Sequence, residues 1–175
     1  MRIAISGTHL AGKTTLSEAL AEALRGYELV PEPYYLLDDF AAMPSIEDFE
    51  SQLERSIQLL NDSAPDTIFD RCPLDFLGYI AAHDDAEAFD TRAWLPRVRN
   101  CMPLLDVIAF VPIEVPDRVD VPREQLRFRA RVDAELRDIV LDDRYGFDLN
   151  AIEVRGTTEQ RLRQLLHGRQ QRFEP

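Results

Sequence analysis

The spacing of apolar residues along the chain predicts where strands and helices lie. Short, nearly continuous apolar runs are typical of strands buried on both faces, and they occur at residues 2–6, 27–30, 67–69, 104–111 and 151–154. Between them, apolar residues recur every three or four positions, as Leu16, Leu20 and Leu24 do. We therefore expect helices at residues 13–24, 45–61, 73–83, 86–101, 123–141 and 157–170.

Particular residues mark the ends of several of these helices. Ser45, with Asp48 three positions later, is typical of an N-cap, and Thr157 has the same place before the last helix. Pro73 suits a first helical turn, because the N–H that proline lacks would be unpaired there. Pro96 lies inside a helical stretch, and we expect it to break or restart the helix.

Strands that alternate with helices predict an α/β fold with a parallel, five-stranded sheet in three layers. The length of 175 residues and the apolar content of 45% suit a single domain that spans residues 1–175. Ligands of such sheets bind beyond the carboxyl ends of the strands. We therefore expect residues 7–15, Glu32, Asp70, Arg71 and the segment after Val111 to surround one crevice.

Composition limits the classes of partner. The formal net charge of −12 disfavours nucleic acid as a general partner. No apolar run reaches the roughly 18 residues of a membrane span, and the chain begins with strand residues rather than a signal peptide. Cys72 and Cys101 form no disulfide framework or metal-binding spacing. We expect a cytoplasmic protein that binds neither membrane nor nucleic acid.

The only lysine of the chain, Lys13, lies in a glycine-rich loop, whereas every other cationic side chain is arginine. Two glycines that flank four residues before Lys and Thr match the phosphate-binding loop, and the strand before it and the helix after it strengthen the match. Backbone N–H groups and a helix N-terminus can surround a polyphosphate. We expect ATP to be bound by Gly7, Thr8, His9, Leu10, Ala11, Gly12, Lys13, Thr14 and Thr15. Lys13 would neutralise phosphate charge, and Thr14 would hold Mg²⁺.

Charged residues after the second and third strands are candidate catalytic groups. Glu32, between two prolines, can accept a proton from a substrate hydroxyl or hold Mg²⁺ through water. Asp70 is a candidate metal ligand beside Thr14, and Arg71 has the fork geometry that matches a phosphate. Asp75 follows in the first turn of a helix, where a carboxylate also complements the helix dipole.

A third candidate feature is a segment of about residues 114–131 that we expect to act as a lid. Arg123, Arg127 and Arg131 are spaced four apart and would share one helix face, which is unfavourable unless an anion faces them. We expect Arg127 and Arg131 to act on the transferring phosphates and Arg123 to contact the nucleotide. The alternative is a solvated stripe in which Arg131 pairs with Glu135.

Taken together, these motifs resemble a family. The chain resembles small P-loop kinases of the ATPase-type group that contains the ribosylnicotinamide kinase domain of the bacterial nicotinamide-nucleotide regulator. The likeness covers nearly the whole chain: the glycine loop, Pro31-Glu32, residues 70–75, the arginine-rich segment and residues 141–147. The chain is also similar to deoxynucleoside and thymidylate kinases, although Asp70 stands where deoxynucleoside kinases tend to carry glutamate. The resemblance implies a P-loop NTPase fold, the cofactors ATP and Mg²⁺, and a nucleoside or ribosylnicotinamide as small-molecule acceptor.

Two other nucleotide-binding classes disagree with the sequence. A GTPase needs an Asn-Lys-x-Asp motif, which a chain whose only lysine is Lys13 cannot contain. A motor ATPase would end a strand in Asp-Glu, and no predicted strand does so. Two hypotheses remain: a kinase that moves the γ-phosphoryl group of ATP to a small hydroxyl compound, and a module that only holds or slowly hydrolyses ATP. Aromatic residues can line a base pocket by stacking, although they are more often part of the core. The candidates for such a pocket are Tyr34, Tyr35, Phe76, Tyr79 and Trp94.

Overall fold

The computed structural model describes residues 1–32, 44–117 and 123–173. Its centre is a five-stranded sheet with the strand order β2-β3-β1-β4-β5, in which every neighbouring pair is parallel. The strands are β1 (Arg2–Ser6), β2 (Glu28–Val30), β3 (Thr67–Asp70), β4 (Val107–Phe110) and β5 (Ala151–Glu153). The predicted parallel five-stranded sheet is therefore confirmed.

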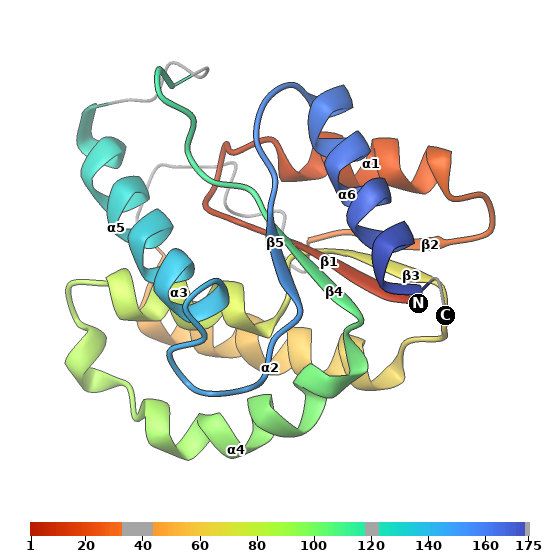
Figure 1. The fold of residues 1–175 in the computed structure, drawn as a ribbon. Helices are drawn as coiled ribbons and strands as arrows, with labels where there is room; N and C mark the ends of the chain where they lie inside the picture. Colours follow the sequence, from red (N-terminus) through yellow and green to blue (C-terminus); the bar gives the residue numbers. More distant parts are fainter. Residues whose placement is uncertain (33–43, 118–122, 174–175) are drawn as a thin grey trace.

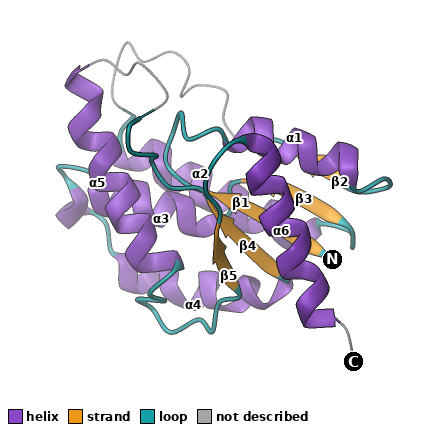
Figure 2. Ribbon diagram, turned by 45° about the horizontal axis from the view of Figure 1, so that its top comes forward, coloured by secondary structure: helices purple, strands orange, loops and turns teal. Residues whose placement is uncertain are grey.

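Helices cover both faces of the sheet (Figure 1). On one face lie α1 (Lys13–Ala23) and α6 (Thr158–Phe173), which contact each other. The other face carries α2 (Ile46–Asp62), α3 (Pro73–Ala82), α4 (Thr91–Cys101) and α5 (Arg123–Val140). Figure 2, turned by 45°, shows the same three layers with the sheet between the helices. The short 3₁₀ helices η2 (Ala86–Ala88) and η3 (Met102–Leu104) flank α4.

The two cores on either side of the sheet follow from the alternation of side chains along a strand. On β1, Ile3 and Ile5 point into the core under α1 and α6, whereas Ala4 points into the larger core under α2, α3 and α5. On β4, Ala109 belongs to the first core, and Ile108 and Phe110 belong to the second. Because both faces of the central strands β1, β3 and β4 are buried, these strands are mostly apolar, as the sequence indicated.

The helix boundaries agree with the predicted end signals. Ser45 and Asp48 form a reciprocal capping box at the start of α2, in which the Ser45 Oγ accepts from the Asp48 N–H at 3.2 Å. Pro73 occupies the first turn of α3. No helix in the described part of the chain is both long and apolar enough to cross a membrane.

Three predictions about elements are wrong. Residues 86–101 do not form one helix: η2 and Asp90, whose side chain accepts from the Arg92 N–H at 3.1 Å, precede a separate helix α4. Pro96 lies inside α4 without ending it, because a proline removes only one backbone hydrogen bond while Val98 and Cys101 keep the helix packed on the core. The strand predicted at residues 104–111 is limited to β4, since residues up to Leu104 complete η3.

Candidate functional site

The glycine loop follows β1 at the carboxyl edge of the sheet, and its backbone explains its glycines. Gly7 has a φ of 148°, and a Cβ there would lie 2.4 Å from the carbonyl oxygen of Val111. Gly12 has a φ of 86°, and a Cβ there would lie 3.1 Å from Arg161 Nη1. Leu10 also has a positive φ, of 57°. The loop is thus wound tightly, in the manner of an anion-binding nest.

Lys13 begins α1 and lies against this loop. Only 4% of the residue is exposed, and its Nζ donates to the Thr8 carbonyl at 2.9 Å. Burial, followed by the charge of Arg71, lowers the pKa of Lys13 from 10.5 to about 8. The ammonium therefore remains protonated at neutral pH, in an environment where an added anion would stabilise it.

Thr14, in the first turn of α1, and Asp70, the last residue of β3, meet as the sequence predicted. The Thr14 hydroxyl donates to Asp70 Oδ2 at 2.6 Å. The other carboxylate oxygen, Oδ1, is buried and has no hydrogen-bond partner in the described part of the protein. Hydroxyl and carboxylate oxygens are ligands that Mg²⁺ accepts, and this ion commonly binds one or two protein groups together with substrate phosphates. These two residues therefore fit a magnesium ion bound with ATP.

Arg71 connects Glu32 to the loop. Its Nε pairs with Glu32 Oε1, its Nη1 donates to the Gly7 carbonyl at 3.1 Å, and 1% of its side chain is exposed. Burial acts to lower the Arg71 pKa, but Tyr79, Glu32 and Asp75 hold it above its ordinary value. The backbone of Arg71 has a φ of 87°, a strained conformation for a residue with a side chain. The chain thus bends sharply after β3, and the guanidinium lies between loop and carboxylate.

Helix α3 supports the loop through two residues spaced four apart. Asp75 Oδ1 accepts from the Gly7 N–H at 3.0 Å, and the Tyr79 hydroxyl accepts from the His9 N–H at 2.7 Å. Arg71 Nη2 also approaches the Tyr79 hydroxyl, at 3.3 Å. Burial, followed by the charges of Arg71, Lys13 and Arg129, lowers the pKa of His9 to about 3, so its imidazole is neutral at physiological pH.

The predicted lid arginines lie differently from one another. Arg131 is 48% exposed at its side chain and pairs with Asp84 at 2.6 Å, rather than with Glu135. Arg127 is exposed, and the side chain of Arg123, like residues 118–122 of the proposed lid, lies outside the described part. The structure brings neither Arg127 nor Arg131 to the loop, so their roles stay predictions.

A different arginine of α5 contacts the loop. Arg129 is 2% exposed, its Nε donates to the His9 carbonyl at 2.9 Å, and its Nη2 donates to the Leu10 carbonyl at 3.3 Å. Its Nη1 pairs with Asp117, which follows β4. The sequence did carry a signal for it: Arg129 lies three residues before buried Val132 and seven before buried Leu136, on the apolar stripe of the helix.

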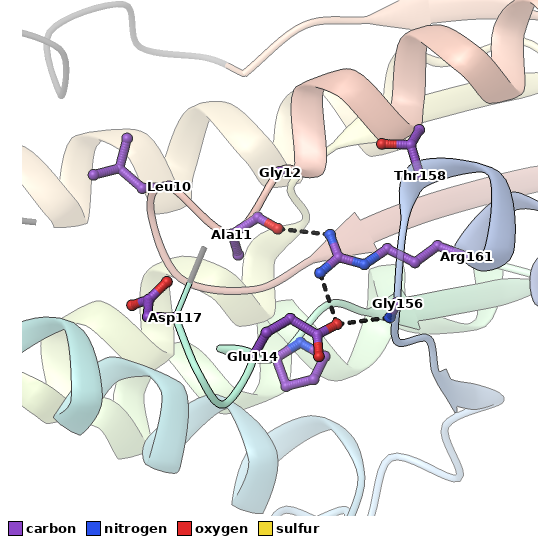
Figure 3. Close-up of a pocket in the computed structure, with 9 residues that line it drawn as sticks. Leu10, Ala11, Gly12, Glu114, Asp117, Gly156, Thr158 and Arg161 are labelled. Atoms are coloured by element: carbon purple, nitrogen blue, oxygen red, sulfur yellow. Dashed lines mark hydrogen bonds and ion pairs between the residues drawn. The ribbon is translucent and has the colours of Figure 1, made fainter. Parts of the chain in front are cut away.

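A pocket of about 340 Å³ opens beside the loop, between the segments that follow β4 and β5 (Figure 3). Arg161 of α6 points into it and donates to the Ala11 carbonyl at 2.8 Å and to Glu114 Oε1 at 3.0 Å. Glu114 Oε1 also accepts from the Gly156 N–H at 2.7 Å. The residues that line the pocket are Leu10, Ala11, Gly12, Pro112, Glu114, Asp117, Gly156, Thr158 and Arg161. The sequence analysis did not identify Glu114 individually or Arg161 at all.

The aromatic candidates for a base pocket are divided. Phe76 is fully buried in the core, and Trp94 stacks on Phe89 at a centroid distance of 6.1 Å. Tyr79 alone of those described lies at the loop, where its ring stacks on Phe49 at 5.2 Å. Tyr34 and Tyr35 lie outside the described residues.

Comparison with known proteins identifies a family and solved structures of similar fold. A family model described as an AAA domain matches residues 2–161. No curated protein is detectably similar in sequence. Among solved structures, deoxyadenosine kinase from M. mycoides with bound dATP is similar, with a TM-score of 0.67 and 18% identity over 97% of this chain and 100% of that one. Thymidylate kinase from Candida albicans has a TM-score of 0.64 and 18% identity over 98% and 91% of the two chains. The three-layer P-loop NTPase fold is thereby confirmed.

Proposed function

The chain belongs to this AAA domain family, and from that premise we propose that it transfers the γ-phosphoryl group of ATP to the hydroxyl of a small nucleoside-type acceptor. The observation that carries the proposal is the Glu32–Arg71 pair, held against the loop through the Gly7 carbonyl. A carboxylate beside a phosphate site adds electrostatic repulsion, which the paired Arg71 guanidinium offsets here, and a functional role would account for its place. Accepting or orienting the proton of an attacking hydroxyl is such a role.

The remaining residues divide the work of phosphoryl transfer. Lys13 neutralises charge on the β- and γ-phosphates, and Thr14 and Asp70 hold the magnesium ion, which neutralises phosphate charge when it is bound. Arg71 orients Glu32 and adds a fixed positive charge at the crevice. Most of the rate enhancement in such reactions comes from positioning and electrostatic stabilisation. The buried charged residues Lys13, Asp70 and Arg71, which lie where β1 and β3 end, supply both.

The pocket beside Arg161 is the proposed place of the ATP base. It adjoins residues 10–12 of the loop on the side away from Glu32, so a nucleotide whose phosphates occupy the loop has its base within reach of it. Its volume of about 340 Å³ is within the range of small-molecule sites. The acceptor then approaches from the Glu32 side. M. mycoides deoxyadenosine kinase, similar in fold, supports a nucleoside as the acceptor class, and ribosylnicotinamide belongs to the same chemical class.

The alternative is a module that binds or slowly hydrolyses ATP without an acceptor, and the family description, an AAA domain, is compatible with it. The two are separated by incubating the protein with ATP, Mg²⁺ and a panel of nucleosides that includes ribosylnicotinamide. ADP and phosphorylated products are then measured by mass spectrometry. We expect ADP and one phosphorylated nucleoside in equal amounts, and neither with Lys13→Ala. ADP formed at the same rate without any acceptor, and no phosphorylated product, would establish the hydrolytic module instead.

A further inference from the structure

The carbonyl groups on the rear of the glycine loop are held by buried arginines from two helices. Arg129 of α5 binds the carbonyls of His9 and Leu10, and Arg161 of α6 binds the carbonyl of Ala11. Neither arginine lies at the end of a strand or within the glycine loop. Each guanidinium donates hydrogen bonds to carbonyl oxygens of that loop, although the loop itself is expected to bind an anion.

These three carbonyls determine where three N–H groups point. In a trans peptide the C=O and the following N–H lie on opposite sides, and the sole cis bond in the described part is Val115–Pro116. Holding the carbonyls of His9, Leu10 and Ala11 from behind therefore turns the N–H groups of Leu10, Ala11 and Gly12 away from the arginines, toward the crevice.

The N–H groups of the loop divide accordingly. Those of Gly7 and His9 are bound by Asp75 and Tyr79 of α3 and are unavailable to a ligand. Those of Leu10, Ala11 and Gly12 have no acceptor among the described residues. The N–H groups whose peptide carbonyls the arginines hold are therefore among the loop donors that remain for a ligand, together with those of the first turn of α1.

Arg161 is itself fixed from two directions. Its Nη2 pairs with Glu114 Oε1 at 3.0 Å, and the same oxygen accepts from Gly156, so the segments after β4 and β5 both locate the guanidinium. Gly12 lies close to it, since a Cβ there would lie 3.1 Å from Nη1, tighter than an ordinary contact. Hydrogen bonds of Arg161 and Glu114 thus connect α6, the segments after β4 and β5, and the Ala11–Gly12 peptide (Figure 3).

We infer that Arg129 and Arg161 are positioning residues for a polyphosphate, and that they act through the peptide groups of the loop without touching the anion. Each guanidinium fixes and polarises the peptide whose N–H binds phosphate, because hydrogen bonds in a chain strengthen one another. The inference rests on the proposed function in so far as ATP supplies the polyphosphate. It concerns the phosphate groups alone, whatever the base or the acceptor.

Arg161 gives the sharper test, since it lies outside the expected lid. Arg161→Met keeps much of the side-chain volume, and Arg163→Met, exposed on the same helix, is the matched control. Affinities for inorganic pyrophosphate and ATP are measured by calorimetry. We expect Arg161→Met to weaken the binding of both by about tenfold, the effect of one hydrogen bond to a charged group, with the control like wild type. An unchanged pyrophosphate affinity in Arg161→Met, or an equal loss in the control, would overturn the inference.

A second variant, Glu114→Gln, tests the inference if Arg161→Met does not fold. Glu114→Gln loosens Arg161 without removing it, and its pyrophosphate affinity is expected to fall by about threefold. In ¹⁵N-labelled protein, the downfield shift that pyrophosphate causes in the Gly12 amide proton should shrink in Glu114→Gln, and an unchanged shift contradicts the inference. Wild-type protein that binds pyrophosphate but phosphorylates no acceptor would overturn the proposed function and leave this inference standing. Wild-type protein that binds no pyrophosphate would overturn the inference.

Discussion

One arginine directly follows β3 and several lie along α5, and the two regions differ in how many of their arginines are buried at the loop. Arg71 comes directly after a buried strand, is almost fully buried, and binds both Glu32 and the loop. On α5, Arg127 and Arg131 face outward, and Arg129 between them is buried against the loop. The sheet fixes where the residue after a strand lies, whereas a helix carries side chains around its whole circumference. The position of Arg71 therefore follows from the strand, but on α5 the packing against other elements decides which arginine reaches the loop.

The largest expected effect on turnover is that of replacing Lys13. Replacing it with alanine removes the single cation that the first turn of α1 holds in the loop. Turnover should fall by at least about 10³-fold, the size of effect expected for lost charge stabilisation of a transition state. Steady-state kinetics with circular dichroism as a fold control measure it. A folded Lys13→Ala protein with unchanged turnover would remove the basis for the proposed kinase.

Glu32 and Asp70 allow the two strand-end carboxylates to be distinguished. Glu32→Gln should lower turnover by about 10²-fold or more, the lower end of a general-base contribution, while ATP affinity stays nearly intact. Asp70→Asn should also raise the magnesium concentration needed for half-maximal rate, because it weakens the site shared with Thr14. Turnover is measured against magnesium concentration for both variants. If only Glu32→Gln shifts this dependence, the roles of the two carboxylates are reversed.

Three variants on α5 test whether the buried arginine and the exposed arginines of this helix have different roles. Arg129→Met should weaken ATP binding by about tenfold, since it releases two loop carbonyls, and Arg131→Met should change it by less than about twofold because its partner Asp84 is exposed. Arg127→Met tests whether an exposed arginine reaches phosphate only with ATP bound, in which case turnover falls and ATP affinity changes little. Fluorescent-nucleotide titration and kinetics give both quantities. Equal effects of all three variants would contradict the division of the helix into a buried and an exposed face.

The smallest effect concerns the stability of the ligand-free protein. The folded pKa of Lys13, about 8, lies below its unfolded value of 10.5, so its contribution disfavours folding below pH 8 and this cost disappears as the pH rises to 10.5. Lys13→Met should therefore be more stable than wild type at pH 7, by at most about 3 kcal/mol. Urea denaturation at pH 7 to 10 should show wild type gaining on the variant as the pH rises. A constant difference would show that Lys13 is not strained by burial.

The fold was largely predictable because its signals are local. The buried strands have unbroken apolar runs, and the Ser45–Asp48 and Pro73 signals each depend on residues within one helical turn. Strand ends of a parallel sheet converge, so the meeting of Thr14 with Asp70, and of Arg71 with Glu32, followed from the predicted topology. Pro96 was misjudged because the packing of α4 outweighs one lost hydrogen bond.

The rear of the loop was not predicted, because its contacts join residues far apart in the sequence. Arg161 binds a carbonyl 150 positions away, and Arg129 binds one 120 positions away. Each lies on a mostly apolar helix face, Arg161 one turn before buried Leu165 and Arg129 three residues before Val132. An arginine on such a stripe signals a buried partner, but the identity of that partner depends on how helices pack across the sheet.

Because Lys13 is the only lysine, a lysine-specific protease can cut this chain only at the glycine loop. A lysine-specific protease has one bond to cut in this chain, after Lys13, where only 4% of the residue is exposed and the helix α1 begins. Cutting requires the first turn of α1 to unwind, so the rate at which the intact chain disappears measures how often the loop opens. If a polyphosphate binds the loop as proposed, it would slow this opening, and the amount of intact chain left after proteolysis would then report ligand binding.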